Sequence, residues 1–177
     1  MIVSSHPFPL SNPLDVQPPG IRWAELRQDV LNTLVRNAPG EEPRMLDLSA
    51  MLTRPAILRR LAATLAERLP PATERLVAPS AAGVTLVAAV ALESGLPFCL
   101  LTPADGVFGD LFPGEPVVLV TAVTATGSAV SATASALISR GARVLTVLTA
   151  LDTNLGAAER LGAQGLDYIA CIRTEEV

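Results

Sequence analysis

The chain has 177 residues, half of them hydrophobic and only 3% aromatic, so one domain with a core of Leu, Val and Ala is expected. Its net charge of −4 and its lack of a basic tract argue against a nucleic-acid partner bound through phosphate contacts. The N-terminus lacks the pattern of a signal peptide and the apolar run 86–92 is too short to cross a bilayer, so we expect a soluble cytoplasmic protein without a membrane partner.

The first segment, residues 1–20, contains prolines at positions 7, 9, 13, 18 and 19. Proline lacks the amide donor and fixes φ, so this segment is expected to be an extended arm. Residues 21–177 are expected to form one domain. From Ile21 the apolar residues recur at three- and four-residue spacing, which predicts a helix that ends before Pro39.

The rest of the chain alternates between strand-like and helix-like patterns. A short strand is expected at 45–49 and a helix at 54–69, ended by Pro70-Pro71. The later expected strands are 74–78, 97–101, 117–121, 143–150 and 167–172, and the later helices are 83–94, 128–140 and 155–162. Such alternation predicts βαβ crossovers and a mostly parallel sheet covered by helices on both faces.

The arginine, histidine and cysteine residues limit the kinds of site that the chain can form. All thirteen basic residues are arginine, and none lies in the 64 residues between 76 and 139. The single His6 lies in the Pro-rich arm, so no His-based metal cluster is expected. Cys99 and Cys171 lie in apolar, strand-like stretches and are expected to be buried, reduced thiols.

Two loops follow predicted strands, at 79–83 (PSAAG) and 121–129 (TAVTATGSA). Ligands of open α/β sheets bind beyond the carboxyl ends of the strands. The second loop leads into a helix N-terminus, where free amides and the helix dipole favour an anion. Its small residues let the backbone approach a ligand, and its hydroxyls add donors, so this loop is a candidate phosphate site. The candidate binding residues are Ala125, Thr126, Gly127, Ser128 and Ala129, together with Thr121 at the start of this loop and Ser80 and Gly83 of the first loop.

The stretches LVAPSAAGVTLVAAVALESGLPF and VVLVTAVTATGSAVSATASALISRGARVLTVLTALD occur in an order that resembles the type I phosphoribosyltransferases, closest to the orotate phosphoribosyltransferases. The resemblance covers residues 45–172. It implies an α/β fold with a central, mostly parallel sheet flanked by helices, and with an N-terminal hood reduced between residues 37 and 48. It also implies that Ala125 to Ala129 bind the 5′-phosphate of a ribose and that Ser80 to Gly83 help to bind pyrophosphate.

Several positions depart from the pattern of that family. The two adjacent acids that hold the ribose hydroxyls fall on Thr121 and Ala122, the Arg-Lys pair falls on Thr102-Pro103, and the arginine that holds orotate falls on Thr153. A pyrophosphate leaving group needs cations or Mg²⁺ to stabilise its departure. We therefore expect no catalytic residue, no metal ligand and no cofactor, with Mg²⁺ present only if phosphoribosyl pyrophosphate is bound.

Two functions agree with this pattern. The first is a non-catalytic binding or regulatory subunit, a pseudoenzyme of nucleotide metabolism that binds ribose 5-phosphate or a nucleotide and forms a homodimer or a heteromer with an active relative. The alternative is an active phosphoribosyltransferase that moves ribose 5-phosphate from phosphoribosyl pyrophosphate to a nucleobase or an unusual acceptor. A nucleotide-binding oxidoreductase fits less well, because residues 117–130 contain one glycine where the dinucleotide fingerprint requires three.

Overall fold

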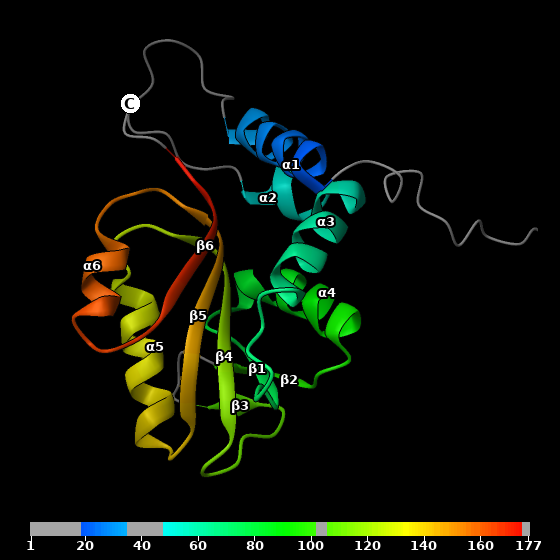
Figure 1. Cartoon of the computed structure of the whole chain (residues 1–177). Coiled ribbons are helices and arrows are strands. Elements are labelled where there is room, and N and C mark those ends of the chain that lie inside the picture. Colours follow the sequence, from blue (N-terminus) through cyan, green and yellow to red (C-terminus); the bar gives the residue numbers. More distant parts are fainter. Residues whose placement is uncertain (1–18, 35–47, 102–105, 175–177) are drawn as a thin grey trace, which may run out of the picture.

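The computed structural model describes residues 19–34, 48–101 and 106–174, and Figure 1 shows a twisted sheet between two groups of helices. The strands are β1 (Arg75–Ala78), β2 (Phe98–Leu101), β3 (Val107–Phe108), β4 (Pro116–Thr124), β5 (Arg143–Asp152) and β6 (Tyr168–Arg173). The helices are α1 (Pro19–Leu34), α2 (Leu48–Leu52), α3 (Pro55–Ala66), the 3₁₀ turn η2 (Ala81–Gly83), α4 (Val84–Ser94), α5 (Ser128–Ser139) and α6 (Ala157–Gly162).

The six strands form one sheet in the order β3-β2-β1-β4-β5-β6. Every neighbouring pair is parallel except β2 and β3. This confirms the predicted α/β class and the mostly parallel sheet. The sequence did not predict β3, because a two-residue strand is too short to show a period.

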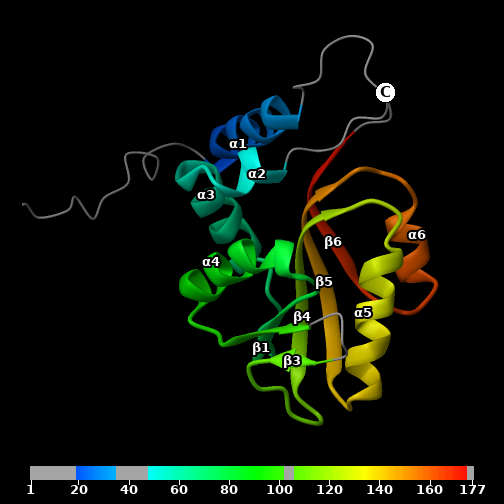
Figure 2. The same cartoon turned by 180° about the vertical axis from the view of Figure 1, so that it is seen from behind.

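Helices cover both faces of the sheet, as expected for parallel strands joined by crossovers. Helices α1 to α4 pack on one face and α5 and α6 on the other, which the two opposite views show plainly (Figures 1 and 2). Each face has its own hydrophobic core: Val118, Val120 and Leu148 point toward α1 to α4, and Leu119 and Val147 point toward α5 and α6. The central strands are therefore apolar on both sides.

The predicted strand at 45–49 is wrong where the structure describes it, because Leu48–Leu52 forms helix α2. Leu48, Met51 and Leu52 have helical spacing and pack into the same core, so tertiary contacts select the helix. The predicted arm is also too long, since α1 begins at Pro19. Proline is tolerated in the first helical turn, where its missing amide has no intrahelical partner. The rest of the arm and the hood segment 35–47 lie outside the described residues.

Two central strands extend beyond their predicted ends. Strand β4 continues to Thr124 and β5 continues to Asp152, because the two strands pair with each other over this extra length. Thr121 and Ala122 are therefore strand residues and not part of a loop.

Both cysteines are buried free thiols, as predicted from their apolar surroundings. Burial raises the pKa of Cys99 from 9.0 to about 11, and the nearby Arg75 guanidinium opposes this shift. Above pH 9 the unfolded chain loses the thiol proton before the folded chain does, so the stability must fall as the pH rises toward 11.

We expect Cys99→Ala to show a shallower loss of stability over this pH window than the native protein. The difference is at most about 2–3 kcal/mol, since one pKa unit corresponds to about 1.4 kcal/mol. Urea unfolding on both sides of pH 9 measures it. Cavity formation lowers the stability of the variant at every pH, so the pH slope is the informative quantity, and equal slopes would contradict the prediction.

Candidate phosphate-binding site

The two candidate loops follow neighbouring strands at the same edge of the sheet. Val77 of β1 is paired with Leu119 of β4, so the turn after Ala78 lies beside the last third of β4. Turn η2 contacts β4 directly. The loop 125–129 leaves β4 at this carboxyl edge and enters α5, as Figure 1 shows. The structure thus brings both predicted segments to the edge where ligands of open α/β sheets bind.

Gly127 gives the loop its shape. It has a left-handed φ of 74° and forms the N-cap of α5. A Cβ at this position would lie 3.2 Å from the Cα of Ala157, at the start of α6. Glycine is therefore required both for the backbone conformation and for the close approach of the loop to α6.

The N-terminus of α5 presents polar groups to solvent. Thr126 and Ser128 are exposed, and their hydroxyl oxygens lie 3.1 Å apart. The Ser128 amide is 3.5 Å from the Thr126 hydroxyl, and the first full helical bond is donated by the Ser131 amide to the Gly127 carbonyl at 2.8 Å. The preceding amides have no acceptor within the helix, and no acid occupies the first turn. This end can therefore bind an anion.

The small turn after β1 is less specialised. Ser80 is exposed and extended, and its carbonyl accepts a bond from the Gly83 amide at 3.0 Å. A Cβ on Gly83 would meet nothing closer than 3.8 Å, and its φ is negative. Any small residue would therefore fit at position 83. Ser80 and Gly83 lie beside the loop, but the backbone geometry does not require a glycine there.

Thr121 and Ala122 are both buried in β4. The Thr121 hydroxyl donates to the carbonyl of Val123 at 3.2 Å, and Ala122 belongs to the core that α1 to α4 cover. Neither side chain offers a free polar group at the edge of the sheet. The two positions therefore contribute no carboxylate and no available hydroxyl to a ligand.

Two charged residues at the same edge were not among the predicted site residues. The strand register pairs Thr124 with Asp152 and Asp152 with Arg173, so the three residues lie side by side at the ends of β4, β5 and β6. Asp152 is buried, and its Oδ1 accepts a bond from the Asn154 amide at 2.9 Å. No signal in the sequence pointed to either residue, because Asp152 and Arg173 both lie just beyond the predicted ends of their strands, at 150 and 172.

Three buried hydroxyls near this edge have no hydrogen-bond partner among the described residues: those of Thr124, Thr153 and Tyr168. Burial raises the pKa of Tyr168, and its phenol lies close enough to Thr124 and Asp152 for both to influence that pKa. The Thr153 amide donates to the Thr124 carbonyl at 3.0 Å. The segment between the loop and Arg173 is thus rich in hydroxyl groups.

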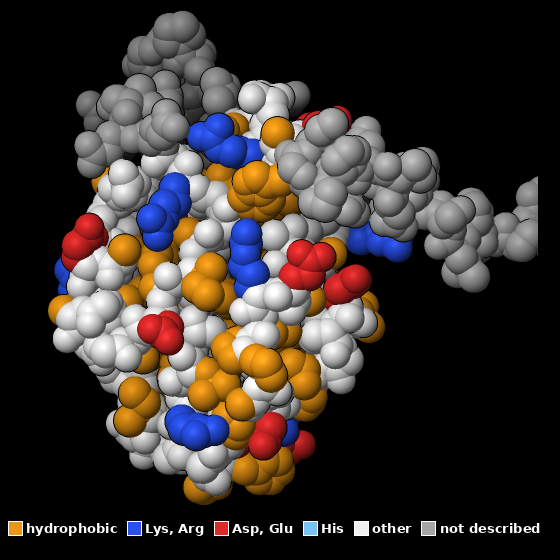
Figure 3. All heavy atoms as spheres, viewed as in Figure 1, with side chains coloured by type: hydrophobic (Ala, Val, Ile, Leu, Met, Phe, Trp, Pro, Cys, Tyr) orange, Lys and Arg blue, Asp and Glu red, His pale blue; other side chains and the backbone are white. Residues whose placement is uncertain are grey.

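The other two strand arginines lie at the opposite edge. Arg75 begins β1 and Arg143 begins β5, so both are at the amino ends of their strands. Figure 3 shows the arginines of one face scattered among acidic, neutral and apolar side chains, without a continuous basic patch among the coloured residues. Arg173 is therefore the strand arginine that shares an edge with the loop.

Residues 19–34, 48–101 and 106–174 contain no group of three His, Cys, Asp or Glu side chains that could hold a metal ion. The resemblance to the phosphoribosyltransferases implies Mg²⁺ bound together with phosphoribosyl pyrophosphate. The described side chains do not gather carboxylates that fit such an ion. Of the helices described, none is both long and apolar enough to span a membrane.

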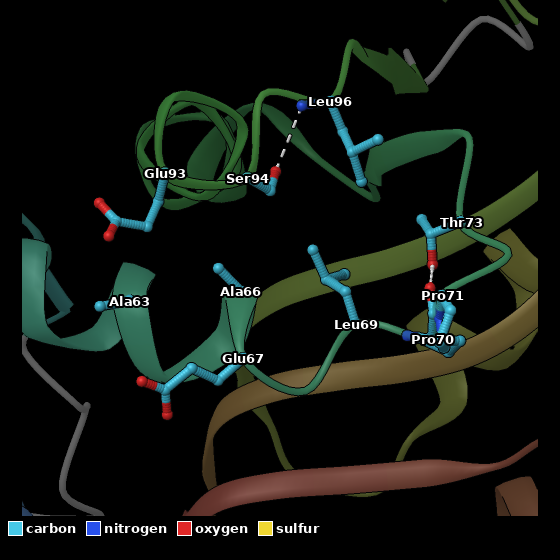
Figure 4. A pocket seen from close by; sticks show the side chains of 10 residues that line it. All are labelled: Ala63, Ala66, Glu67, Leu69, Pro70, Pro71, Thr73, Glu93, Ser94 and Leu96. Atoms are coloured by element: carbon cyan, nitrogen blue, oxygen red, sulfur yellow. Dashed lines mark hydrogen bonds between the residues drawn. The ribbon is translucent and has the colours of Figure 1, made fainter.

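A separate hollow of about 460 Å³ lies between α3 and α4 (Figure 4). Its lining includes Ala63, Glu67, Thr73, Glu93 and Leu96. Thr73 precedes β1 and Leu96 precedes β2, so the hollow lies at the amino edge of the sheet, away from the loop. It has no part in the candidate site.

Comparison with known sequences gives one consistent group of relatives. No protein-family model matches the chain. It is 31% identical over 139 residues to a protein of Methanoculleus marisnigri named orotate phosphoribosyltransferase, a match that covers 75% of this chain and 80% of that protein. The orotate phosphoribosyltransferase of Thermococcus gammatolerans is 26% identical over 147 residues, which is 77% of this chain and 78% of that one.

Solved structures show which fold the chain shares. The orotate phosphoribosyltransferase of Mycobacterium tuberculosis in complex with 5-phospho-α-D-ribosyl 1-diphosphate matches with a TM-score of 0.73 at 22% identity, over 86% of this chain and 96% of that chain. A phosphoribosyltransferase from Corynebacterium diphtheriae matches with a TM-score of 0.74 at 22% identity over the same fractions. These likenesses show a shared fold.

Proposed function

The chain belongs to the type I phosphoribosyltransferase family, close to orotate phosphoribosyltransferase, and from this premise we propose that it acts on ribose 5-phosphate carried by phosphoribosyl pyrophosphate or by a nucleotide. One observation carries the proposal. The loop 125–129 has its glycine in a left-handed conformation at the N-terminus of a 12-residue helix, with two exposed hydroxyls beside free amides. This arrangement suits a phosphate dianion.

The reaction that the relatives favour is transfer of the ribosyl 5-phosphate group. The bond between C1 of the ribose and pyrophosphate breaks, a bond from C1 to a ring nitrogen of the acceptor base forms, and the proton of that nitrogen passes to the released pyrophosphate or to water. In this proposal, the 5′-phosphate anchored at 125–129 holds the ribose, while Mg²⁺ arrives with the pyrophosphate. Arg173 also weakens the electrostatic objection raised by the sequence, since it adds one cation to this edge from outside the arginine-free segment.

A second candidate is a non-catalytic binding subunit, which would pair with a second copy or with an active relative. It is favoured by Thr121 and Ala122, whose side chains are buried and cannot hold ribose hydroxyls. A carboxylate pair that binds those hydroxyls would stabilise the transition state more than the ground state, so its loss affects turnover more than binding.

An activity assay combined with calorimetry separates the two candidates. The purified protein is mixed with phosphoribosyl pyrophosphate, orotate and Mg²⁺, and both pyrophosphate release and nucleotide formation are followed. In parallel, calorimetry measures the binding of ribose 5-phosphate.

We expect ribose 5-phosphate to bind and nucleotide to form. Binding without nucleotide formation, also with other nucleobases, would favour the non-catalytic subunit. If neither binding nor turnover occurs, both candidate functions are wrong.

A further inference from the structure

Resting on the proposed function, we propose that Arg173 binds a second anionic group of the ligand whose 5′-phosphate lies at 125–129. The sequence and the family pattern assign no role to this residue. The ligand class is therefore a phosphorylated ribose that carries another acidic group at its far end. Two sources share this chemistry, a carboxylate on the base and the pyrophosphate of a phosphoribosyl donor.

The position of Arg173 follows from the strand register. Thr124 immediately precedes the loop, and it pairs with Asp152, which pairs with Arg173. Adjacent strands are about 4.8 Å apart, so two spacings place the Arg173 backbone about 10 Å from that of Thr124. This span matches a ligand that is anchored at the loop and extends along the edge of the sheet.

The Arg173 guanidinium is available to a ligand. Its side chain is 57% exposed, whereas that of Asp152 is 3% exposed. The Nε of Arg173 lies 3.7 Å from Oδ2 of Asp152, beyond hydrogen-bonding distance, so this contact orients the side chain without using its donors. A guanidinium has five N–H donors in a planar fork, which suits a carboxylate or a phosphate.

Asp152 has a positioning role in this arrangement. Its carboxylate is buried, and Oδ1 is already bonded to the Asn154 amide. Arg173 therefore lies between this negative charge and the solvent, where an anionic ligand would approach. The hydroxyls of Thr124 and Thr153 are buried in the strip between the two anchors, so they are not available to the ligand, and the second anchor depends on Arg173 alone.

Calorimetry with variants of the full chain tests this inference. Arg173→Gln removes the charge, Arg173→Lys keeps it without the planar fork, and Arg143→Gln is the matched control, because Arg143 is an exposed arginine at the other end of β5. The ligands are ribose 5-phosphate, uridine 5′-monophosphate, its 6-carboxylated form and phosphoribosyl pyrophosphate with Mg²⁺.

We expect Arg173→Gln to lower the affinity for the ligands with a second acidic group by at least about tenfold. This corresponds to the loss of one charge-assisted hydrogen bond. Ribose 5-phosphate and uridine 5′-monophosphate should change less than about twofold, Arg173→Lys should restore part of the loss, and Arg143→Gln should have no effect. A loss confined to the carboxylated nucleotide identifies the base as the source, and a loss confined to phosphoribosyl pyrophosphate identifies the pyrophosphate.

Equal binding of all ligands by the native protein and Arg173→Gln would overturn the inference while the proposed function stands. A uniform loss for all four ligands would also overturn it, because it would indicate a general disturbance of the edge. If the native protein binds none of the ligands, the proposed function itself is wrong.

Discussion

Replacing Glu115 with alanine is expected to lower the free energy of unfolding by about 3–5 kcal/mol, because the change leaves Arg75 charged and buried without a partner. The two side chains are only 10% and 7% exposed, and Nε of Arg75 lies 2.8 Å from Oε1 of Glu115. The other carboxylate oxygen accepts a bond from the Phe112 amide at 3.0 Å. The Phe112 ring also covers the guanidinium, at 5.6 Å from its centre.

This ion pair connects the start of β1 to the residue that precedes β4, so its loss weakens the pairing of the two central strands. Urea unfolding followed by circular dichroism measures the effect. Glu74→Ala is the matched control, because Glu74 is exposed and adjacent to Arg75, and we expect it to change the stability by no more than about 0.5 kcal/mol. Similar losses in the two variants would contradict the prediction.

A compensating variant tests the cause of the loss. Combining Arg75→Met with Glu115→Ala removes the unpaired charge and keeps apolar bulk in its place. Replacement of a buried ion pair by well-packed apolar residues is often neutral. We therefore expect the double variant to recover most of the lost stability, whereas a loss as large as that of the single variant would point to packing and not to charge.

Gly127→Ala is expected to abolish or strongly weaken the binding of ribose 5-phosphate, by at least about tenfold, or about 1.4 kcal/mol. The left-handed φ of 74° costs an L-residue about 1–2 kcal/mol. The new Cβ would also lie 3.2 Å from Cα and 3.4 Å from Cβ of Ala157, so the loop or α6 must move. This movement displaces the amides and hydroxyls that would hold the phosphate.

Gly95→Ala is the matched control for this substitution. Gly95 has the same φ of 74°, but a Cβ there would meet no atom within 4 Å. Both variants therefore bear the same backbone strain, and only Gly127→Ala adds a steric conflict. Thermal unfolding should show a larger loss for Gly127→Ala, and calorimetry should show weaker binding for it alone. Native affinity in Gly127→Ala would remove the loop from the proposed site.

The alternation of strands and helices was predictable because it depends on local patterns. Periodic apolar residues, Pro70-Pro71 and the glycines at the ends of helices mark most of the elements within a few positions. The short elements were not predictable. Helix α2 and strand β3 are too short to show a period, and their conformation is selected by the core and by the neighbouring strand.

In the candidate site, too, some features were predictable from the local sequence and others depend on the tertiary structure. That the loop 125–129 follows a strand and begins a helix could be read directly from its sequence, as could the missing acids at Thr121 and Ala122. The reason why position 127 must be glycine could not, because it depends on Ala157, which lies thirty residues later in the chain. The position of Arg173 beside the loop depends on the order and register of β4, β5 and β6.

The sequence by itself determined the class of fold, the segments of regular structure and the residue types of the phosphate loop, because each depends on neighbours within one or two helical turns. Only the tertiary structure decided which charges stand at the carboxyl edge. Parallel strands are joined by long crossovers, and residues as distant as Thr124 and Arg173 become neighbours only when the strand order is set.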